Sequence, residues 1–192
     1  MRLILASASP RRAELLRAAG IEFDVIPADV NEDLDPEDSP DGYVRRVAQL
    51  KAEAVIPLAP GRPILGADTI VLVDNAVLGK PVDAADARRM LRLLSGREHT
   101  VVTAVCLVNP AAESGRIQTR VVRTTVEFAP LSDGELDWYV ASGEPMDKAG
   151  AYAIQGLAAR FVTRISGSYS NVAGLPVAVV YNLCKGAGLL IS

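Results

Sequence analysis

The sequence predicts a domain of the α/β or α+β class, built around a mixed β-sheet. Apolar segments with strand-like patterns alternate with segments whose apolar residues recur at helical spacing. Two long predicted strands, at 100–108 and 117–128, are joined by a short segment rich in Pro, Gly and Ser, which is typical of a hairpin. A sheet that contains this hairpin besides strand–helix–strand units is mixed rather than wholly parallel.

Each element has a local signal in the sequence. Strands are predicted where apolar residues form a run or alternate with polar ones, at 2–6, 21–27, 63–73, 76–78, 100–108, 117–128, around Tyr152 and at 161–165. Helices are predicted where a capping residue or a proline precedes an apolar periodicity. These helix starts are Ser9-Pro10, Ser39-Pro40, Asp83, the capping box of Ser132 and Glu135, and Pro176.

The second helix carries apolar residues at helical spacing. Tyr43, Val47, Leu50 and Ala54 predict one buried stripe along it. Lys51 directly follows Leu50, so this phase places Lys51 on the helix surface.

Composition limits the possible functions. The chain has 192 residues, 49% of them apolar and 22% charged, which indicates one globular domain or two small lobes that share a core. A net charge of −3 speaks against a nucleic-acid-binding surface. One histidine, His99, and two cysteines, Cys106 and Cys184, exclude a zinc site with several His or Cys ligands. Any functional metal therefore needs mostly oxygen ligands, which favours Mg²⁺ or Mn²⁺.

The sequence also predicts the cellular setting and parts of the core. No apolar run reaches the ~18 residues that a membrane span needs, and the first seven residues are too short for a signal peptide. A cytoplasmic protein with reduced thiols and no membrane partner is expected. Trp138 and Phe128 are expected in the core, and His99 is expected to pack beside a strand without a catalytic role.

Three segments carry residues suited to chemistry. Ser7-Ala-Ser-Pro-Arg-Arg12 lies between a strand and a helix, where it forms either a phosphate cradle or a capped helix with solvated arginines. Asp68 lies inside the apolar strand 63–73, where a carboxylate needs a charged partner or a metal. The segment 144–156 sets polar groups, among them Gln155, between glycines, as in a pocket lining or a plain turn.

Two further residues have weaker signals. Glu32 is one of many acids in 29–41, and a solvated acidic loop accounts for it equally well. Lys80 follows a short strand, at a position from which a lysine can point into a cleft.

Six ordered motifs spread over nearly the whole chain resemble those of the Maf family of nucleoside triphosphate pyrophosphatases, the septum formation proteins. The motifs are Leu5-Ala-Ser-Ala-Ser-Pro-Arg-Arg12, Gly66-Ala-Asp-Thr69, Leu78-Gly-Lys-Pro81, Leu94-Ser-Gly-Arg97, Asp147-Lys-Ala-Gly-Ala-Tyr-Ala-Ile-Gln-Gly156 and Gly167-Ser-Tyr-Ser-Asn171.

The resemblance implies a single domain over 1–192, with an elongated mixed α/β sheet, flanking helices and a central cleft between two lobes, similar to inosine triphosphate pyrophosphatases. It implies hydrolysis of a nucleoside triphosphate to the monophosphate and pyrophosphate with a divalent cation. The segment around Gln155 and the pair Asp68-Thr69 resemble the branch that acts on dTTP and UTP, with modified pyrimidine nucleotides as further candidates. A homodimer is also expected from the family.

The resemblance also assigns roles to single residues. It makes Asp68 the catalytic acid–base residue and, together with Glu32, a metal ligand. The other pocket positions that it implies are Ser7, Arg11, Arg12, Lys51 and Lys80, with Arg11, Thr69 and Gln155 at positions that set base specificity. Two alternatives stay open at this point: a non-catalytic nucleotide-binding regulator of cell division, and a pyrophosphatase that acts on 7-methyl-GTP.

Overall fold

The computed structural model describes residues 2–35, 37–74, 76–112 and 116–190. The chain divides into two compact units. Unit 1 comprises Met1–Asp68, Thr103–Val122 and Gly174–Ser192, and unit 2 comprises Thr69–Val102 and Arg123–Ala173. Three long strands, β3 (Ile64–Val73), β5 (Glu98–Val108) and β6 (Ile117–Phe128), contribute residues to both units.

The strands follow the order β2-β1-β3-β5-β6-β7, with β4 (Ala76–Leu78) paired to β3. β1 (Leu3–Leu5) pairs in parallel with β2 (Phe23–Val25) and with β3, whereas β4 and β7 (Val162–Ser166) pair antiparallel with β3 and β6. The mixed sheet predicted from the sequence is therefore confirmed. The predicted turn between β5 and β6 includes 113–115, which lie outside the described residues.

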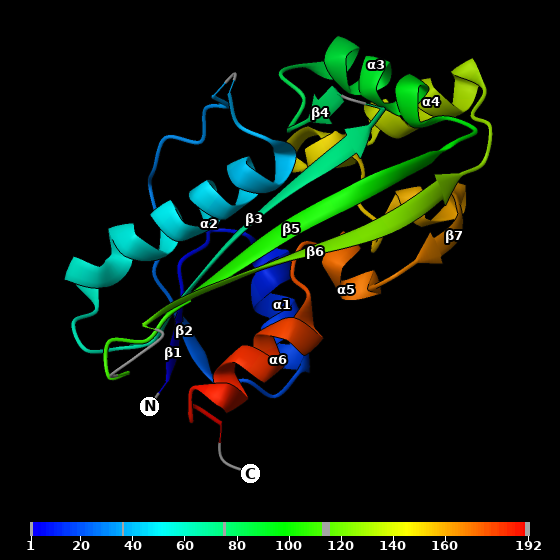
Figure 1. Ribbon diagram of the computed structural model, residues 1–192. Helices are drawn as coiled ribbons and strands as arrows, with labels where there is room; N and C mark the ends of the chain where they lie inside the picture. The colour runs from blue at the N-terminus through cyan, green and yellow to red at the C-terminus, as the bar shows by residue number, and fades with distance from the viewer. Residues whose placement is uncertain (1, 36, 75, 113–115, 191–192) are drawn as a thin grey trace. The chain divides into compact units, whose positions relative to one another are not determined.

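Helices cover both faces of the sheet in unit 1 (Figure 1). One face carries Leu3, Leu5, Leu65, Ala67, Val105 and Leu107, which pack with α1 (Pro10–Ala18) and α6 (Val177–Gly186) in one apolar cluster. The opposite face of β3 carries Gly66 and Asp68, because side chains alternate along a strand. This second face meets α2 (Pro40–Val55).

A glycine sets the distance between α2 and β3. A Cβ added at Gly66 would lie 2.1 Å from the carbonyl oxygen of Ala48 and 2.8 Å from the amide nitrogen of Ala52. No side chain fits there, so Gly66 permits a backbone-to-backbone approach between helix and strand. This approach determines which face of α2 is buried.

The buried face of α2 differs from the predicted one. Leu50 and Ala54, expected inside, are exposed, whereas Lys51, expected on the surface, is buried. The residues that face inward are Tyr43, Val44, Val47, Ala48, Lys51, Ala52 and Val55. The prediction failed because two neighbouring apolar stripes run along this helix, and the contact with Gly66 selects the one that includes Ala48 and Ala52.

Unit 2 has an aromatic core. His99 of β5, Phe128 of β6 and Tyr152 pack edge to face, with ring centroids 4.9 to 5.3 Å apart. The segment around Tyr152 is not a strand as expected but follows the 3₁₀ turn Ala149–Ala151. Further 3₁₀ turns in this unit are Glu144–Asp147 and Leu157–Phe161, and one in unit 1 is Ile56–Leu58.

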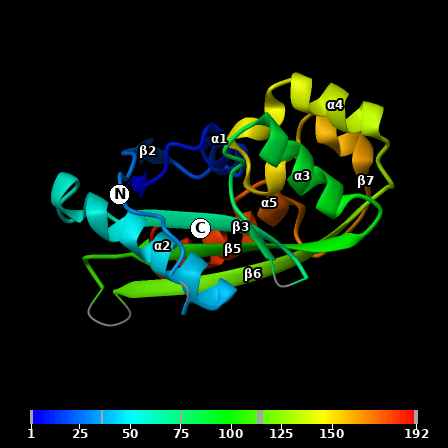
Figure 2. The ribbon, with the colours of Figure 1, turned by 90° about the horizontal axis from the view of Figure 1, so that it is seen from above.

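Two helices lie side by side on unit 2, α3 (Ala84–Leu94) and α4 (Asp133–Ala141) (Figure 1 and Figure 2). α4 begins with the predicted capping box of Ser132 and Glu135. The prediction of Trp138 as a core residue is wrong, because its side chain on α4 is 42% exposed and lies under the guanidinium of Arg160, 4.2 Å from the ring centroid. A short helix, α5 (Tyr169–Val172), completes this unit.

Candidate active site

The segment between β1 and α1 fixes an arginine beside a serine. Ser7 and Arg12 are both buried, and the Arg12 guanidinium donates to Ser7 Oγ (3.1 Å) and to the carbonyl oxygen of Gly174 (2.9 Å). Arg11 is half-buried beside them. Ser9 occupies the N-cap position, but its side chain does not cap the helix, and its N–H instead donates to Ser7 Oγ (3.2 Å). The arginine is therefore built into the fold rather than solvated.

A buried lysine joins two carboxylates in unit 1. Lys51 Nζ lies 2.8 Å from Asp68 Oδ1 and 3.0 Å from Glu32 Oε2. The side chains of Lys51 and Asp68 are 9% and 8% exposed, whereas Glu32 is 45% exposed. Asp68 thus has the charged partner that a carboxylate in a core strand requires. The surface position predicted for Lys51 from helix phase was therefore wrong, and the pocket role that the family resemblance implies for it stays a prediction.

The charge balance around Asp68 shifts its acidity. Burial raises the pKa of Asp68, and the positive charges of Lys51 and Arg12 oppose that rise only in part. Burial likewise lowers the pKa of Arg12, against the opposing charge of Asp68. Asp68 and Arg12 therefore interact electrostatically within unit 1, as a carboxylate more basic than an ordinary aspartate beside a fixed guanidinium.

The acidic loop that carries Glu32 is tied to α2 by two residues without an obvious sequence signal. The Tyr43 hydroxyl donates to the carbonyl oxygen of Glu32 (2.7 Å), and Arg46 donates to Asp38 Oδ2 (3.0 Å) and to the carbonyl oxygen of Asp33 (3.0 Å). Burial, with Asp68 and Glu32 nearby, raises the pKa of Tyr43 to about 12, so the phenol keeps its proton and donates. These contacts place Glu32 beside Lys51.

Thr69, Lys80 and Gln155 belong to unit 2. Thr69 follows Asp68 along β3 and is half-buried, Lys80 follows β4 and is exposed, and Gln155 is exposed directly after the buried Ile154. Their roles in binding stay predictions.

The donor set fits a divalent cation of the Mg²⁺ class. Within the described part of the chain, no three His, Cys, Asp or Glu side chains form a group that could hold a metal. Two carboxylates, Glu32 and Asp68, nevertheless meet at a single ammonium group, so the space between them already suits a positive charge. Mg²⁺ commonly binds through one or two carboxylates and takes its other oxygens from water and phosphates.

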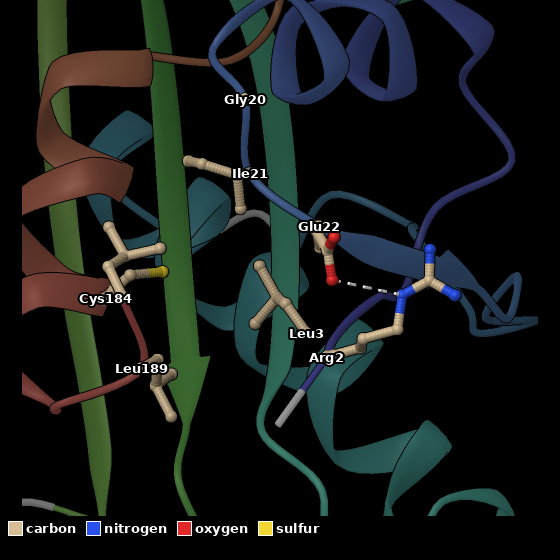
Figure 3. Close-up of a pocket in the computed structure, with 8 residues that line it drawn as sticks. Arg2, Leu3, Gly20, Ile21, Glu22, Cys184 and Leu189 are labelled. Atoms are coloured by element: carbon tan, nitrogen blue, oxygen red, sulfur yellow. Dashed lines mark ion pairs between the residues drawn. The ribbon is translucent and has the colours of Figure 1, made fainter. Parts of the chain in front are cut away.

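A separate cavity of about 370 Å³ lies in unit 1 (Figure 3). Its lining includes Leu3, Ile21, Cys184 and Leu189, with an ion pair between Arg2 Nε and Glu22 Oε2 at 3.8 Å. None of the predicted site residues lines it. Burial raises the pKa of the Cys184 thiol to about 11, so the thiol is protonated and unreactive at neutral pH.

Cys106 and Cys184 are both unpaired and buried, as the expectation of reduced thiols requires. Among the described helices, none has the length and apolar character to cross a bilayer.

Comparisons with known proteins show which family the chain belongs to. The model of the family described as "Maf-like protein" matches residues 2–187. A dTTP/UTP pyrophosphatase of Anaeromyxobacter dehalogenans (strain 2CP-C) is 54% identical over 187 residues, which cover 97% of this chain and 94% of the relative. A dTTP/UTP pyrophosphatase of Syntrophus aciditrophicus (strain SB) is 47% identical over 189 residues, with 98% and 91% coverage.

A solved structure supports the fold. The structure of the Staphylococcus aureus Ham1 protein matches with a TM-score of 0.53 over 97% of this chain and 99% of that chain, at 15% identity. This likeness confirms the predicted mixed α/β architecture with a central sheet flanked by helices. The match to residues 2–187 and the near full-length relatives agree with the six motifs. The chain belongs to the Maf family.

Proposed function

We propose that this protein is a nucleoside triphosphate pyrophosphatase that hydrolyses dTTP and UTP to the nucleoside monophosphate and pyrophosphate. The observation that carries the proposal is the buried Lys51–Asp68 pair, joined by the partly exposed Glu32 and set beside the fixed Arg12, in a chain about 50% identical to dTTP/UTP pyrophosphatases. The cluster combines phosphate-binding cations with carboxylates suited to a metal and to proton transfer.

The cations bind the triphosphate. Arg12, oriented by Ser7 and Gly174, presents a planar group that suits phosphate oxygens, and Arg11 adds a second guanidinium at the same helix start. Lys51 contributes a compact charge beside Asp68. Lys80 is proposed to extend this set from unit 2.

Glu32 and Asp68 would hold the divalent cation, Mg²⁺ or Mn²⁺, through their carboxylate oxygens. When bound, this cation neutralises phosphate charge and makes the phosphorus more electrophilic. Lys51 keeps the two carboxylates together, and Tyr43 holds the Glu32 backbone in place.

Asp68 is proposed to accept a proton from the attacking water. The water oxygen forms a bond to the α-phosphorus while the bond to the bridging oxygen of the β-phosphate breaks, and pyrophosphate leaves with that electron pair. Burial raises the pKa of Asp68, so its carboxylate takes a proton more readily than an exposed aspartate does. Activity should therefore decline on acidification at a higher pH than an ordinary Asp would set, because the protonated carboxyl no longer accepts a proton.

Gln155 is proposed to read the base, with Thr69 and Arg11. A glutamine amide offers one acceptor and two donors, so it can pair with adjacent donor and acceptor groups of uracil or thymine. One such bidentate pairing gives about 1–3 kcal/mol of discrimination against a base with another pattern.

The test is a panel of nucleoside triphosphates assayed with Mg²⁺, with Mn²⁺ and with a chelator, with the products identified. We expect metal-dependent release of pyrophosphate and monophosphate, fastest with dTTP and UTP. Asp68→Asn should lower kcat by roughly 10²–10⁴-fold, the usual effect of a general base. The fold should survive, because Lys51 keeps its pair with Glu32.

Three outcomes would contradict the proposal. An Asp68→Asn variant as active as the parent removes Asp68 from the mechanism. Hydrolysis of 7-methyl-GTP in preference to UTP assigns the protein to another branch of the family. Binding without hydrolysis of any triphosphate makes it a nucleotide-binding regulator.

The predicted homodimer and cytoplasmic location belong to the same proposal. Sedimentation equilibrium of the purified chain tests the first, and fractionation of cells that express it tests the second.

A further inference from the structure

A short segment of unit 2 presents the exposed amide of Gln155 directly after a buried stretch. Tyr152, Ala153 and Ile154 are buried, Gln155 and Leu157 are exposed, and Ala158 is buried again. This stretch is neither helix nor strand until the 3₁₀ turn Leu157–Phe161 begins. Something other than a strand ladder must therefore hold Gln155 in place.

A tyrosine–glutamate pair bonds to the main chain on both sides of Gln155. The Tyr139 hydroxyl donates to Glu144 Oε1 (2.7 Å) and accepts from the N–H of Ala153 (3.2 Å). Glu144 Oε2 accepts from the N–H of Leu157 (2.9 Å). Glu144 Oε1 also accepts from the N–H of Ala158 (3.4 Å). We call this pair and its three main-chain contacts the clamp. The same two side chains therefore bond to the main chain both before and after Gln155.

The clamp lies tightly against the main chain, and its phenol stays a hydrogen-bond donor at neutral pH. A Cβ added at Gly156 would lie 2.2 Å from Glu144 Oε2, so the main chain beside Gln155 lies directly against the carboxylate. Tyr139 is fully buried, and burial together with its bond to Glu144 raises the pKa of the phenol, which stays a donor at neutral pH. Bonds that involve an ionised acceptor are shorter and stronger than neutral ones.

We propose that Tyr139 and Glu144 are positioning residues for base selection. The inference rests on the proposed function, in which Gln155 reads the base. A bidentate pairing discriminates only while the amide keeps its orientation, and the clamp fixes the main chain that sets this orientation. Removing the clamp leaves the triphosphate-binding residues of unit 1 unchanged but lets the amide adopt other orientations.

The test compares UTP with CTP, whose base carries an amino group where uracil carries a carbonyl. In Tyr139→Phe, the hydroxyl is lost and the ring is kept, and we expect the UTP/CTP ratio of kcat/KM to fall at least fivefold, mainly through a higher KM for UTP. Gln155→Ala should lower the ratio by at least as much. In the double variant the two losses should not add, because both changes remove the same pairing.

Ser132→Ala is the matched control. It removes the N-cap of α4, the helix that carries Tyr139, and so lowers the melting temperature without touching the clamp. The UTP/CTP ratio of this variant should equal that of the parent. If Tyr139→Phe does not fold, Glu144→Gln takes its place, because the amide removes the charge and at least one acceptor oxygen.

The outcomes separate the two proposals. A parent protein that cleaves no triphosphate overturns the proposed function and this inference with it. A parent that prefers UTP, with the preference lost in Gln155→Ala but kept in both clamp variants, overturns this inference alone. An unchanged preference in Gln155→Ala shows that another group reads the base, and it also overturns the role given to the clamp.

Discussion

The two units hold their predicted site residues by different means. In unit 1, Asp68 is a buried negative charge that the buried positive charges of Lys51 and Arg12 stabilise. In unit 2, the Gln155 segment is held by hydrogen bonds from a buried phenol and a carboxylate to main-chain N–H groups. The charge cluster of unit 1 is sensitive to the loss of Lys51, the one charge that pairs with both carboxylates. Loss of a hydrogen bond from the clamp instead loosens the position of the Gln155 segment by degrees.

This difference predicts that the largest effects on stability come from unit 1. Lys51→Met removes the ammonium between Glu32 and Asp68 and leaves the Asp68 carboxylate buried without its nearest positive partner. We expect a loss of about 3–5 kcal/mol in the free energy of unfolding at neutral pH. The loss should shrink as the pH falls, because protonated Asp68 no longer needs a cation. Urea unfolding at pH 5 and pH 8 measures both effects.

An exposed ion pair of similar length is the control. Arg88 Nε lies 2.6 Å from Asp137 Oδ1 on the surface of unit 2, with side chains 35% and 63% exposed. Asp137→Asn should leave the unfolding midpoint almost unchanged, since solvent screens such pairs. If Lys51→Met and Asp137→Asn lose equal stability, the burial of the Lys51–Asp68 pair does not make it more important for stability than an exposed ion pair.

The second prediction concerns the approach of α2 to β3. Gly66→Ala places a methyl group 2.1 Å from the Ala48 carbonyl oxygen, and neither backbone can move away without disturbing Lys51 and Asp68. We expect a loss of about 3 kcal/mol in the free energy of unfolding, together with a lower kcat. Gly134→Ala in α4, where no atom lies within 4 Å of the new methyl, should instead stabilise the protein slightly. Equal effects at both glycines would refute the close approach.

The third prediction is a pH dependence that originates in unit 2. Burial lowers the pKa of His99 to about 4, from the ordinary value of 6.5, so the folded protein keeps this imidazole neutral. The unfolded chain binds a proton more readily, so the stability that neutral His99 allows is complete above pH 6.5 and declines as the pH falls toward 4. Between pH 7.5 and pH 5 this group alone should remove about 2 kcal/mol.

His99→Phe tests this assignment. The variant keeps an aromatic ring near Phe128 and Tyr152 but cannot take up a proton. Its free energy of unfolding should change less than that of the parent between pH 7.5 and pH 5. Parallel curves for the two proteins would place the acid sensitivity elsewhere.

The sequence predicted the elements well where one periodicity dominates. The buried residues Ala87, Met90, Leu91 and Leu94 form the apolar stripe of α3, and the sheet contains parallel and antiparallel pairs, as the predicted mixed sheet requires. α2 was harder because two apolar stripes compete on it. The correct stripe depends on the contact with Gly66, which is a tertiary event that no local pattern records.

The residues of the candidate site also differ in how well the sequence alone predicts them. Asp68 could be selected from the sequence because a carboxylate within an apolar strand conflicts with its surroundings. Lys51, Glu32 and Gln155 required the resemblance to the family, since each has an ordinary local context. Tyr43 and the clamp residues act on main-chain atoms, and every residue has those atoms. Their partners therefore become visible only in three dimensions.

The stacking of Arg160 on Trp138 has a practical use. The chain contains one tryptophan, and it lies on α4 directly beside Tyr139. Indole emission therefore reports from a single place in unit 2, next to a cation that influences its spectrum. A spectrofluorometer can follow events around the Gln155 segment in the unlabelled protein, without an attached dye.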